Sequence, residues 1–160
     1  MELLIVYHSK TGGSRQMAEA AAEAAREEIP TVLKRADEAE PDDLLGADGY
    51  IFCAPENLAA IAGVMKDFFD RSYYPVLGRI EGRPYAQMVC AGSDGENAAR
   101  QTARIATGWR LREVQPPLIV CTHAQTPEEI LAPKTIPEDE LALCRDLGAA
   151  MAAGLKMGVF

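Results

Sequence analysis

The chain has 160 residues, of which 48% are hydrophobic and 25% charged, so it has about the size of one domain and can bury a core. Its formal net charge of −8 disfavours sequence-independent binding to nucleic acid or to anionic lipid, because both require a basic surface. No apolar run approaches the roughly 20 residues of a bilayer span, and no signal peptide is visible. We therefore expect a cytoplasmic protein without nucleic-acid or membrane partners.

Strand-like and helix-like patterns alternate along the chain. The predicted strands are the apolar runs Leu3–Tyr7, Thr31–Arg35, Tyr50–Ala54, Pro84–Ala91 and Leu118–Thr122. The predicted helices cover residues 14–28, a short turn within 42–49, residues 63–72, residues 96–107 and a last segment that starts near Glu138. Such alternation favours an α/β fold in which helices cover both faces of a doubly wound parallel sheet. Since no repeat, linker or change of composition divides the chain, we expect a single domain over residues 1–160.

The cysteines and histidines give no metal-binding pattern. Cys53, Cys90, Cys121 and Cys144 are scattered without a CxxC spacing, so we interpret them as small, buried hydrophobic residues. The chain has only two histidines, His8 and His123, and both follow predicted strands. A role in proton delivery is conceivable for either, but an ordinary loop position is the simpler interpretation. We predict no metal site.

Ligands of doubly wound sheets bind beyond the carboxyl ends of the strands, which directs attention to residues 9–15, 55–63 and 92–97. The first segment, Ser9-Lys10-Thr11-Gly12-Gly13-Ser14-Arg15, combines three hydroxyls, two glycines and the free amides of a helix N-terminus. These groups suit a terminal phosphate, although a polar turn with a good helix cap remains the alternative. A Walker loop does not fit because Lys10 precedes the glycines, and a GxGxxG fingerprint is absent. A phospho-acceptor receiver domain would need acidic residues where His8-Ser9 and Ala54-Pro55 stand.

Two segments carry a resemblance to a known family. Residues 6–15 resemble the FMN phosphate loop of the flavodoxin-like superfamily, which commonly reads Ser/Thr-x-Thr-Gly-x-Thr/Ser. Residues 55–66, Pro-Glu-Asn-Leu-Ala-Ala-Ile-Ala-Gly-Val-Met-Lys, resemble the Pro-Glu-Tyr-Asn-x-x-Ile-Pro-Gly-x-Leu-Lys run of NAD(P)H-dependent FMN reductases, and residues 68–71 continue it in the style of flavodoxin-like quinone reductases. The sequence departs from that run at Asn57, where the reductases have an aromatic residue that could stack on the flavin; Leu58 or Ile61 could supply apolar contact instead.

The resemblance implies a three-layer flavodoxin-like sandwich with a five-stranded parallel sheet of order 2-1-3-4-5. It also implies FMN as cofactor, rather than FAD, for whose adenosine half no second region is evident. The residues that it places at the cofactor are Ser9, Lys10, Thr11, Gly12, Gly13, Ser14, Arg15, Pro55, Glu56, Asn57, Leu58, Ala59, Ala91, Gly92 and Ser93.

The implied activity is oxidoreduction, in which NAD(P)H is the co-substrate and reduces the flavin at N5, and a quinone, a flavin or another small acceptor takes the electrons. Such chemistry needs no protein nucleophile or general base, so we predict no catalytic residue. The alternative is an electron-carrier flavodoxin that serves a redox partner protein, which the acidic charge also suits. A third possibility, supported only by the missing aromatic residue, is a fold that has lost its flavin.

A homodimer is a further expectation from the resemblance, because reductases of this branch commonly dimerise beside the flavin. The predicted interface residues are Phe68, Phe69, Tyr73 and Tyr74. Together they carry more aromatic area than one core-facing stripe needs. The alternative, equally open, is that both phenylalanines are buried in the monomer and that the tyrosines cover one end of the sheet.

Overall fold

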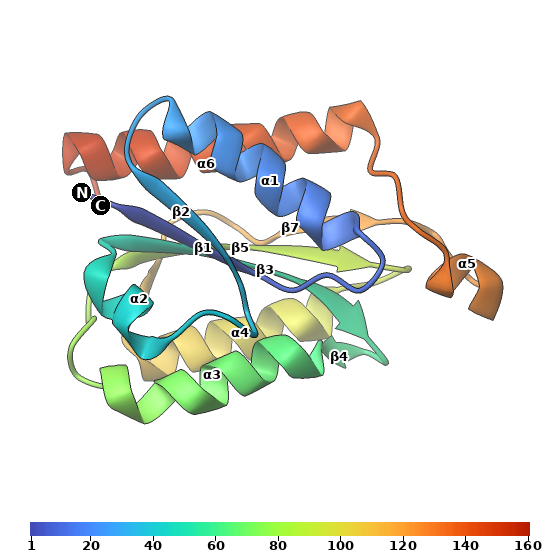
Figure 1. Cartoon of the computed structure of the whole chain (residues 1–160), viewed down its shortest axis with the longest axis horizontal. Coiled ribbons are helices and arrows are strands. Elements are labelled where there is room, and N and C mark those ends of the chain that lie inside the picture. The colour runs from blue at the N-terminus through green and yellow to red at the C-terminus, as the bar shows by residue number, and fades with distance from the viewer.

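A computed structural model describes residues 1–160 and shows one sheet between two layers of helices (Figure 1). The strands are β1 (Leu3–Tyr7), β2 (Thr31–Arg35), β3 (Gly49–Asn57), β4 (Ala60–Ile61), β5 (Pro84–Ala91), β6 (Arg112–Glu113) and β7 (Leu118–Cys121). The helices are α1 (Gly13–Arg26), α2 (Pro41–Gly46), α3 (Gly63–Val76), α4 (Glu96–Gly108), α5 (Pro127–Leu131) and α6 (Glu138–Met157). None of these helices has the combination of length and apolar character that crossing a bilayer requires.

The sheet confirms the predicted doubly wound α/β fold. The five predicted strands are β1, β2, β3, β5 and β7, and their parallel pairs β2–β1, β1–β3, β3–β5 and β5–β7 follow the order 2-1-3-4-5. The structure adds two strands of two residues each: β4 runs antiparallel to β3, and β6 pairs with the start of β5. In this register Tyr7 lies opposite Cys53, and Pro55 lies opposite Cys90, so the carboxyl ends of β1, β3 and β5 open on one edge.

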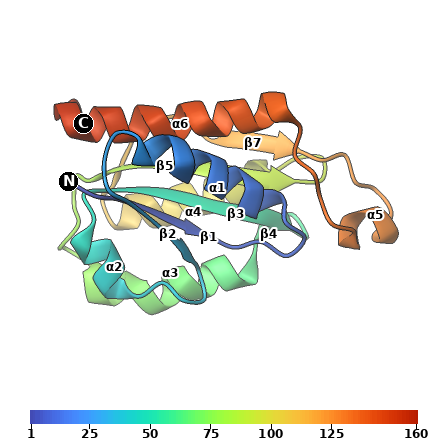
Figure 2. The ribbon, with the colours of Figure 1, turned by 45° about the horizontal axis from the view of Figure 1, so that its top comes forward.

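Helices cover both faces of the sheet (Figure 2), and the two faces are packed with different side chains. α1 and α6 cover one face, largely with alanines, and they approach so closely that a Cβ on Gly148 would overlap the backbone of Ala21. α3 and α4 cover the other face, where Phe52 contacts Phe69 edge-on at a centroid distance of 5.1 Å. The close contact with α6 fixes α1 on the sheet, with its N-terminus beside β3 and β5, where the Cys53 thiol donates to the Ser14 carbonyl.

Three of the four cysteines are buried, as the sequence predicts, and the fourth is only partly buried. Cys53, Cys90 and Cys144 are buried, Cys121 is half-buried, and all four are free thiols. Burial raises the pKa of Cys144 to about 12, so this side chain stays a neutral thiol at physiological pH.

The predicted dimer residues lie mostly inside the monomer. α3 continues past Ser72 to Val76, and Phe68 and Phe69 are fully buried, because this helix packs its aromatic side directly under the sheet. Tyr73 is half-buried and stacks on Trp109 with ring centroids 5.7 Å apart. The expectation that the phenylalanines reach beyond the core is therefore wrong. Of the four predicted interface residues, only Tyr74, which is 79% exposed, projects from the surface.

Candidate cofactor-binding site

A cavity of about 590 Å³ opens beyond the carboxyl ends of β1, β3 and β5. All the residues predicted to contact the cofactor line it, except Gly12 and Arg15, which line a neighbouring cavity. The lining falls into a phosphate end (residues 9–11, 13 and 14), a hairpin end (residues 55–59), the end of β5 (residues 90–93) and a segment after β7. The two sequence motifs and the end of β5 are thus brought together by the sheet, as the parallel topology requires.

The phosphate end is a tight turn that leads into α1. Gly12 has a φ of 97°, a left-handed conformation that favours glycine, and its N–H donates to Ser9 Oγ at 3.1 Å. The amides of Gly13, Ser14 and Arg15 begin α1 and find no acceptor within the protein. Three unpaired N–H groups at a helix N-terminus form an anion-binding position.

The Ser14 side chain gives an independent sign of a missing ligand. Ser14 is 2% exposed, and its Oγ is buried without any hydrogen-bond partner, although its backbone carbonyl accepts from the Cys53 thiol. An unpaired buried hydroxyl costs about 1–3 kcal/mol, so such groups are rare unless a ligand pairs them. Ser14 therefore points to an oxygen-rich ligand at this end.

Gly13 lies between this turn and the end of β5. A Cβ at Gly13 would come within 2.6 Å of Cys90 Sγ, so only glycine lets α1 start this close to β5. Burial raises the pKa of Cys90 to about 11. Cys90 therefore faces the cavity as a neutral thiol, not as a nucleophile.

The hairpin end differs from its prediction. Residues 55–57 continue β3 instead of starting a loop, and β4 returns antiparallel after only two residues, Leu58 and Ala59. Both have positive φ, 50° and 59°, the conformation of a type I′ hairpin turn, which normally uses Asn-Gly. Because the local sequence lacks that signal, the hairpin could not be predicted from it.

Helix α4 holds the hairpin in place. Asn97 Nδ2 donates to the Ala59 carbonyl at 2.6 Å, and Gln101 Oε1 accepts from the Ile61 amide at 2.8 Å. At the tip Leu58 is fully exposed, and at the base Glu56 has a buried Oε2 with no partner. The hairpin thus offers one apolar side chain and one unpaired acceptor to the cavity.

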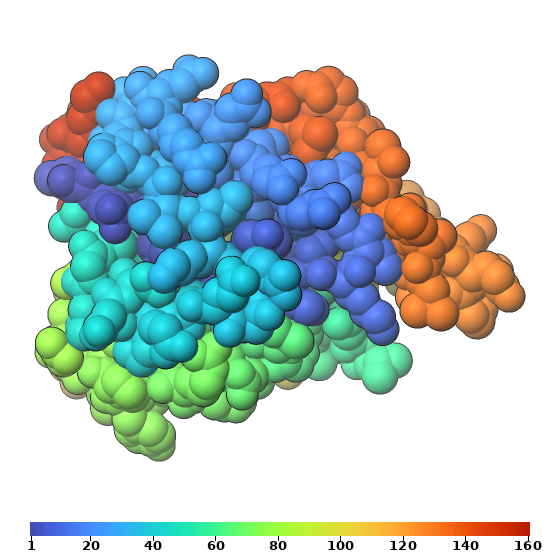
Figure 3. All heavy atoms as spheres, viewed as in Figure 1, coloured from blue at the N-terminus to red at the C-terminus, as the bar shows by residue number.

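Residues 122–136, which follow β7, form a further wall of the cavity that the sequence analysis did not predict. We call this segment the strap. It includes α5 and stands out from the body as the orange lobe of Figure 3. Its residues in the cavity wall are Thr122, Ala124, Gln125, Ile130, Leu131 and Lys134. One local signal could have revealed its helix: Thr126 and Glu129 form a capping box, with Pro127 at the first helical position.

Gln16 fastens the strap to the phosphate end. Its Nε2 donates to the carbonyls of Gly12 and Lys134, at 2.9 and 2.7 Å, and its Oε1 accepts from the Ile136 amide at 3.0 Å. The Lys134 amide also donates to the Thr11 carbonyl at 2.8 Å. Both polar atoms of the Gln16 side-chain amide are thus hydrogen-bonded. They join the phosphate end to the strap, although the two are more than a hundred residues apart in the chain.

These features fit FMN. The free amides, the three hydroxyls and Lys10 match a phosphate monoester, and the volume lies in the range of small-molecule sites. The hairpin and the end of β5 supply apolar surface and backbone polar groups for a flat heteroaromatic ring. A flavodoxin-like fold with this cleft defines a class of flavin-binding proteins.

The comparison with family models gives the particular family. The NADPH-dependent FMN reductase model matches residues 41–126, more than half of the chain, and the chain belongs to that family. This is the branch that the two motifs indicate, and FMN is the cofactor in its name.

Two curated proteins are similar in sequence. A flavodoxin of Aquifex aeolicus is 38% identical over 94 residues, 58% of this chain and 49% of that protein. An NAD(P)H dehydrogenase (quinone) of Acidithiobacillus ferrooxidans is 35% identical over 44% of this chain and 46% of its own length. The chain spans about half the length of the curated relatives that it matches.

Solved structures confirm the fold. A flavodoxin from the domain Archaea superposes with a TM-score of 0.79 at 18% identity and covers 98% of this chain and 99% of its own. The rubredoxin:oxygen oxidoreductase of Desulfovibrio gigas gives 0.81 at 16% identity, over 99% of this chain and 37% of that one. The WrbA-like flavodoxin of Agrobacterium tumefaciens gives 0.71 at 20% identity, over 98% of both chains.

Proposed function

We propose that residues 1–160 act as one flavodoxin-like domain that binds FMN in the cleft and passes electrons from NAD(P)H to a quinone, a flavin or another small acceptor. The observation that carries the proposal is the unpaired Ser14 hydroxyl beside three free amides of α1, inside a cleft with 13 of the 15 predicted contact residues in its lining. The family supports the oxidoreductase class, and the Acidithiobacillus relative supports a quinone as acceptor.

The residues of the chain have separate tasks in this proposal. Ser9, Thr11 and Ser14, with the amides of residues 13–15, hold the phosphate, and Lys10 adds a positive charge. Residues 55–59 and 91–93 border the ring, so that its reactive edge faces the open side of the cleft. Bound FMN supplies the redox chemistry, since it accepts a hydride and returns the electrons to an acceptor. The protein contributes binding, orientation and the local field.

Flavin titration and a turnover assay test the proposal. We expect FMN fluorescence to be quenched on addition of the protein, and we expect NADH or NADPH to be oxidised when a benzoquinone is supplied. Absence of quenching at high micromolar protein would contradict the FMN site. Quenching without turnover would contradict the reductase.

The second candidate is an electron carrier. The Aquifex relative is a flavodoxin, and the net charge of −8 suits docking to a basic redox partner. A carrier binds FMN equally well but oxidises NADPH only when a separate reductase is added. The same assay, run with and without such a reductase, separates the two functions.

For self-association we propose a surface at the end of α3. Tyr74 is 79% exposed there and Leu77 is 45% exposed, which is a small apolar surface. Light scattering during size-exclusion chromatography at tens of micromolar protein tests this. A mass near the 17.3 kDa of one chain would exclude the dimer.

A further inference from the structure

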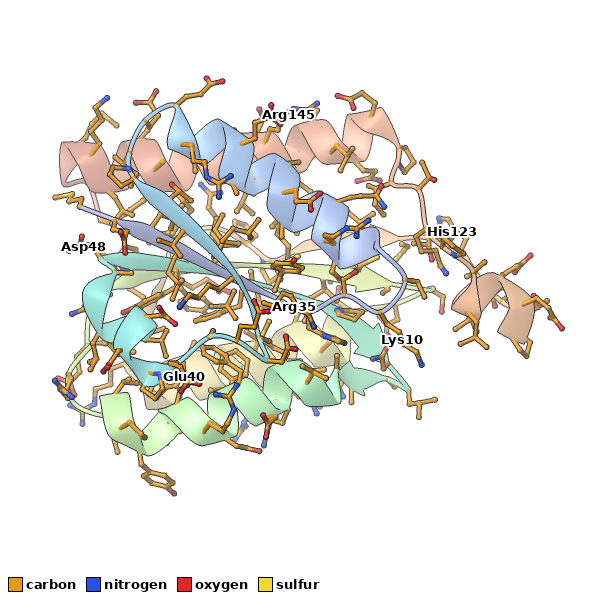
Figure 4. All side chains as sticks on the ribbon, viewed as in Figure 1. Lys10, Arg35, Glu40, Asp48, His123 and Arg145 are labelled. Carbon is orange, nitrogen blue, oxygen red and sulfur yellow. The ribbon has the colours of Figure 1, made fainter.

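A second cavity, of about 460 Å³, lies on the other side of the phosphate turn. The two cavities share residues 9–11 as a common wall, and Leu131 of the strap also lines both. The second one extends from this wall toward the end of β2, where Arg35 lies, and the strap closes its outer side with Leu131 and Pro133. Figure 4 places Lys10 and Arg35 at the carboxyl end of the sheet, far from Asp48 at the opposite end. The second cavity is therefore a compartment beside the flavin cleft, on the other side of the phosphate turn.

The second cavity is basic in an otherwise acidic chain. His8, Lys10, Arg15 and Arg35 line it, and no acidic residue does, although acidic residues outnumber basic ones by 24 to 16 overall. The cations Lys10, Arg15 and Arg35 around one cavity favour an anion, whereas burial lowers the pKa of His8 and favours its neutral form.

The cations of this cavity keep donors free for a ligand. Lys10 forms no ion pair, and Arg15 is 3.8 Å from Glu19. Arg35 donates to Asp37 through Nε at 3.0 Å and through Nη2 at 2.7 Å, which orients the guanidinium and leaves Nη1 without a partner. The Asp37 carboxylate thus positions Arg35 without using all of its donors. A ligand that carries two adjacent phosphates matches the three cations Lys10, Arg15 and Arg35, which line the same cavity.

Part of the remaining lining offers contact to a heteroaromatic base. Beside Ser9, Thr11 and Gly12 of the turn, the cavity is lined by Tyr7, Leu131 and Pro133, and Leu131 is 62% exposed although it is a large apolar side chain. An aromatic and two apolar side chains next to cations provide contact for a base and charge for its phosphates. Adenosine diphosphate has this combination.

We propose that the second cavity binds the ADP moiety of a dinucleotide, with the diphosphate on Lys10, Arg15 and Arg35 and the adenine against Leu131 and Pro133. The inference rests on the proposed function, because an ADP moiety enters an FMN reductase either as part of the NAD(P)H donor or as part of FAD in place of FMN. It also revises the expectation, drawn from the sequence, that the chain has no region for an adenosine half. Residues 9–11 would separate the ADP phosphates from the flavin phosphate.

Calorimetric titration of ADP tests the site, with the full chain measured both without flavin and after loading with FMN. We expect ADP to bind in both states without displacing FMN. Arg35→Gln should raise the Kd of ADP by about fivefold or more, and Arg35→Lys by less, because a charged hydrogen bond is lost or weakened. The FMN Kd should stay within about twofold, since Arg35 does not line the flavin cleft.

Arg110→Gln is the matched control. Arg110 is also an exposed arginine in a surface ion pair, with Glu81 at 3.1 Å, but it lines neither cavity. We expect this variant to bind ADP as the wild type does. The site is excluded if ADP fails to bind at several millimolar, if it competes with FMN, or if Arg35→Gln and Arg110→Gln have equal effects.

Two further measurements separate the sources of the ADP moiety. If the donor uses the site, Arg35→Gln raises the KM for NAD(P)H while the Kd of FMN is unchanged. If FAD uses it, the wild type binds FAD more tightly than FMN and Arg35→Gln abolishes the difference. Failure of FMN to bind would overturn the proposed function alone, because the ADP titration of the flavin-free chain is read independently.

Discussion

The phosphate end and the hairpin end of the cleft are stabilised in different ways. At the phosphate end Gly13 and Ser14 are buried, α1 is packed tightly on α6, and Gln16 joins the turn to the strap. At the hairpin end Leu58 is fully exposed, and both Leu58 and Ala59 have positive φ although neither is a glycine. Two side chains of α4 hold this turn by hydrogen bonds. The first arrangement preorganises donors for a charged group, whereas the second stores backbone strain and leaves a side chain free to adjust. We infer that phosphate binding supplies most of the affinity and that the hairpin modulates it.

The largest expected effect concerns the unpaired hydroxyl at the phosphate end. Ser14→Ala should weaken FMN binding by about 10- to 100-fold, since a hydrogen bond to a charged group contributes about 1.5–3 kcal/mol. The flavin-free protein should be as stable as the wild type or more stable, because the substitution removes a buried polar atom without a partner. Fluorescence titration and urea unfolding measure the two quantities.

Ser72→Ala is the control for this prediction. Ser72 Oγ is likewise buried and unpaired, but it lies in α3 and does not line the cleft. Its substitution should affect stability in the same direction and leave FMN binding unchanged. Equal FMN affinity in both variants would show that Ser14 does not contact the phosphate.

The next effect concerns the packing that holds α1. Gly148→Ala places a methyl group where the backbone of Ala21 lies, so α6 must move away from α1, at a cost of about 1–3 kcal/mol in the free energy of unfolding. Gly46→Ala, at the end of α2, has open space around it and should leave stability nearly unchanged. Urea unfolding of both variants tests the contrast. A loss in Gly148→Ala no greater than in Gly46→Ala would refute the tight contact.

At the hairpin end an added aromatic ring should strengthen FMN binding. Leu58→Tyr supplies a ring near the place where related reductases have one, and a stacked pair contributes about 0.5–1.5 kcal/mol, or about 2- to 12-fold in Kd. Leu77→Tyr, at an exposed leucine after α3, adds the same ring away from the cleft and should leave the Kd unchanged. An unchanged Kd in Leu58→Tyr would place the hairpin tip away from the flavin ring, and a weaker complex would contradict the stacking contact.

The smallest effect is a dependence of stability on pH at the phosphate end. Burial lowers the pKa of His8 below its ordinary value of 6.5, so the folded protein keeps this imidazole neutral where the unfolded chain takes up a proton. His8 therefore favours the folded state above pH 6.5, and this contribution decreases as the pH falls through the lowered pKa. Urea unfolding between pH 7.5 and 5 should show the wild type losing stability relative to His8→Gln. Parallel pH profiles of the two proteins would contradict the prediction.

The sequence by itself determined the features that depend on neighbours along the chain. Alternating apolar runs and helical stripes predict the parallel sheet, because each element must bury one face or stripe. The hydroxyls, glycines and helix start of residues 9–15 likewise form a local unit, and the topology of such sheets places them at the ligand-binding edge. That edge is where the cavity lies.

Only the tertiary structure decided how the walls of the site are completed. Leu58 and Ala59 adopt positive φ because α4 bonds to the hairpin, in spite of their own preferences. The strap borders the cleft because Gln16 reaches Lys134, 118 residues away in the chain, and Phe69 is buried because α3 lies directly under Phe52. These contacts join residues that are distant in sequence, so no local pattern reports them, and they form only when the sheet brings its loops to one edge.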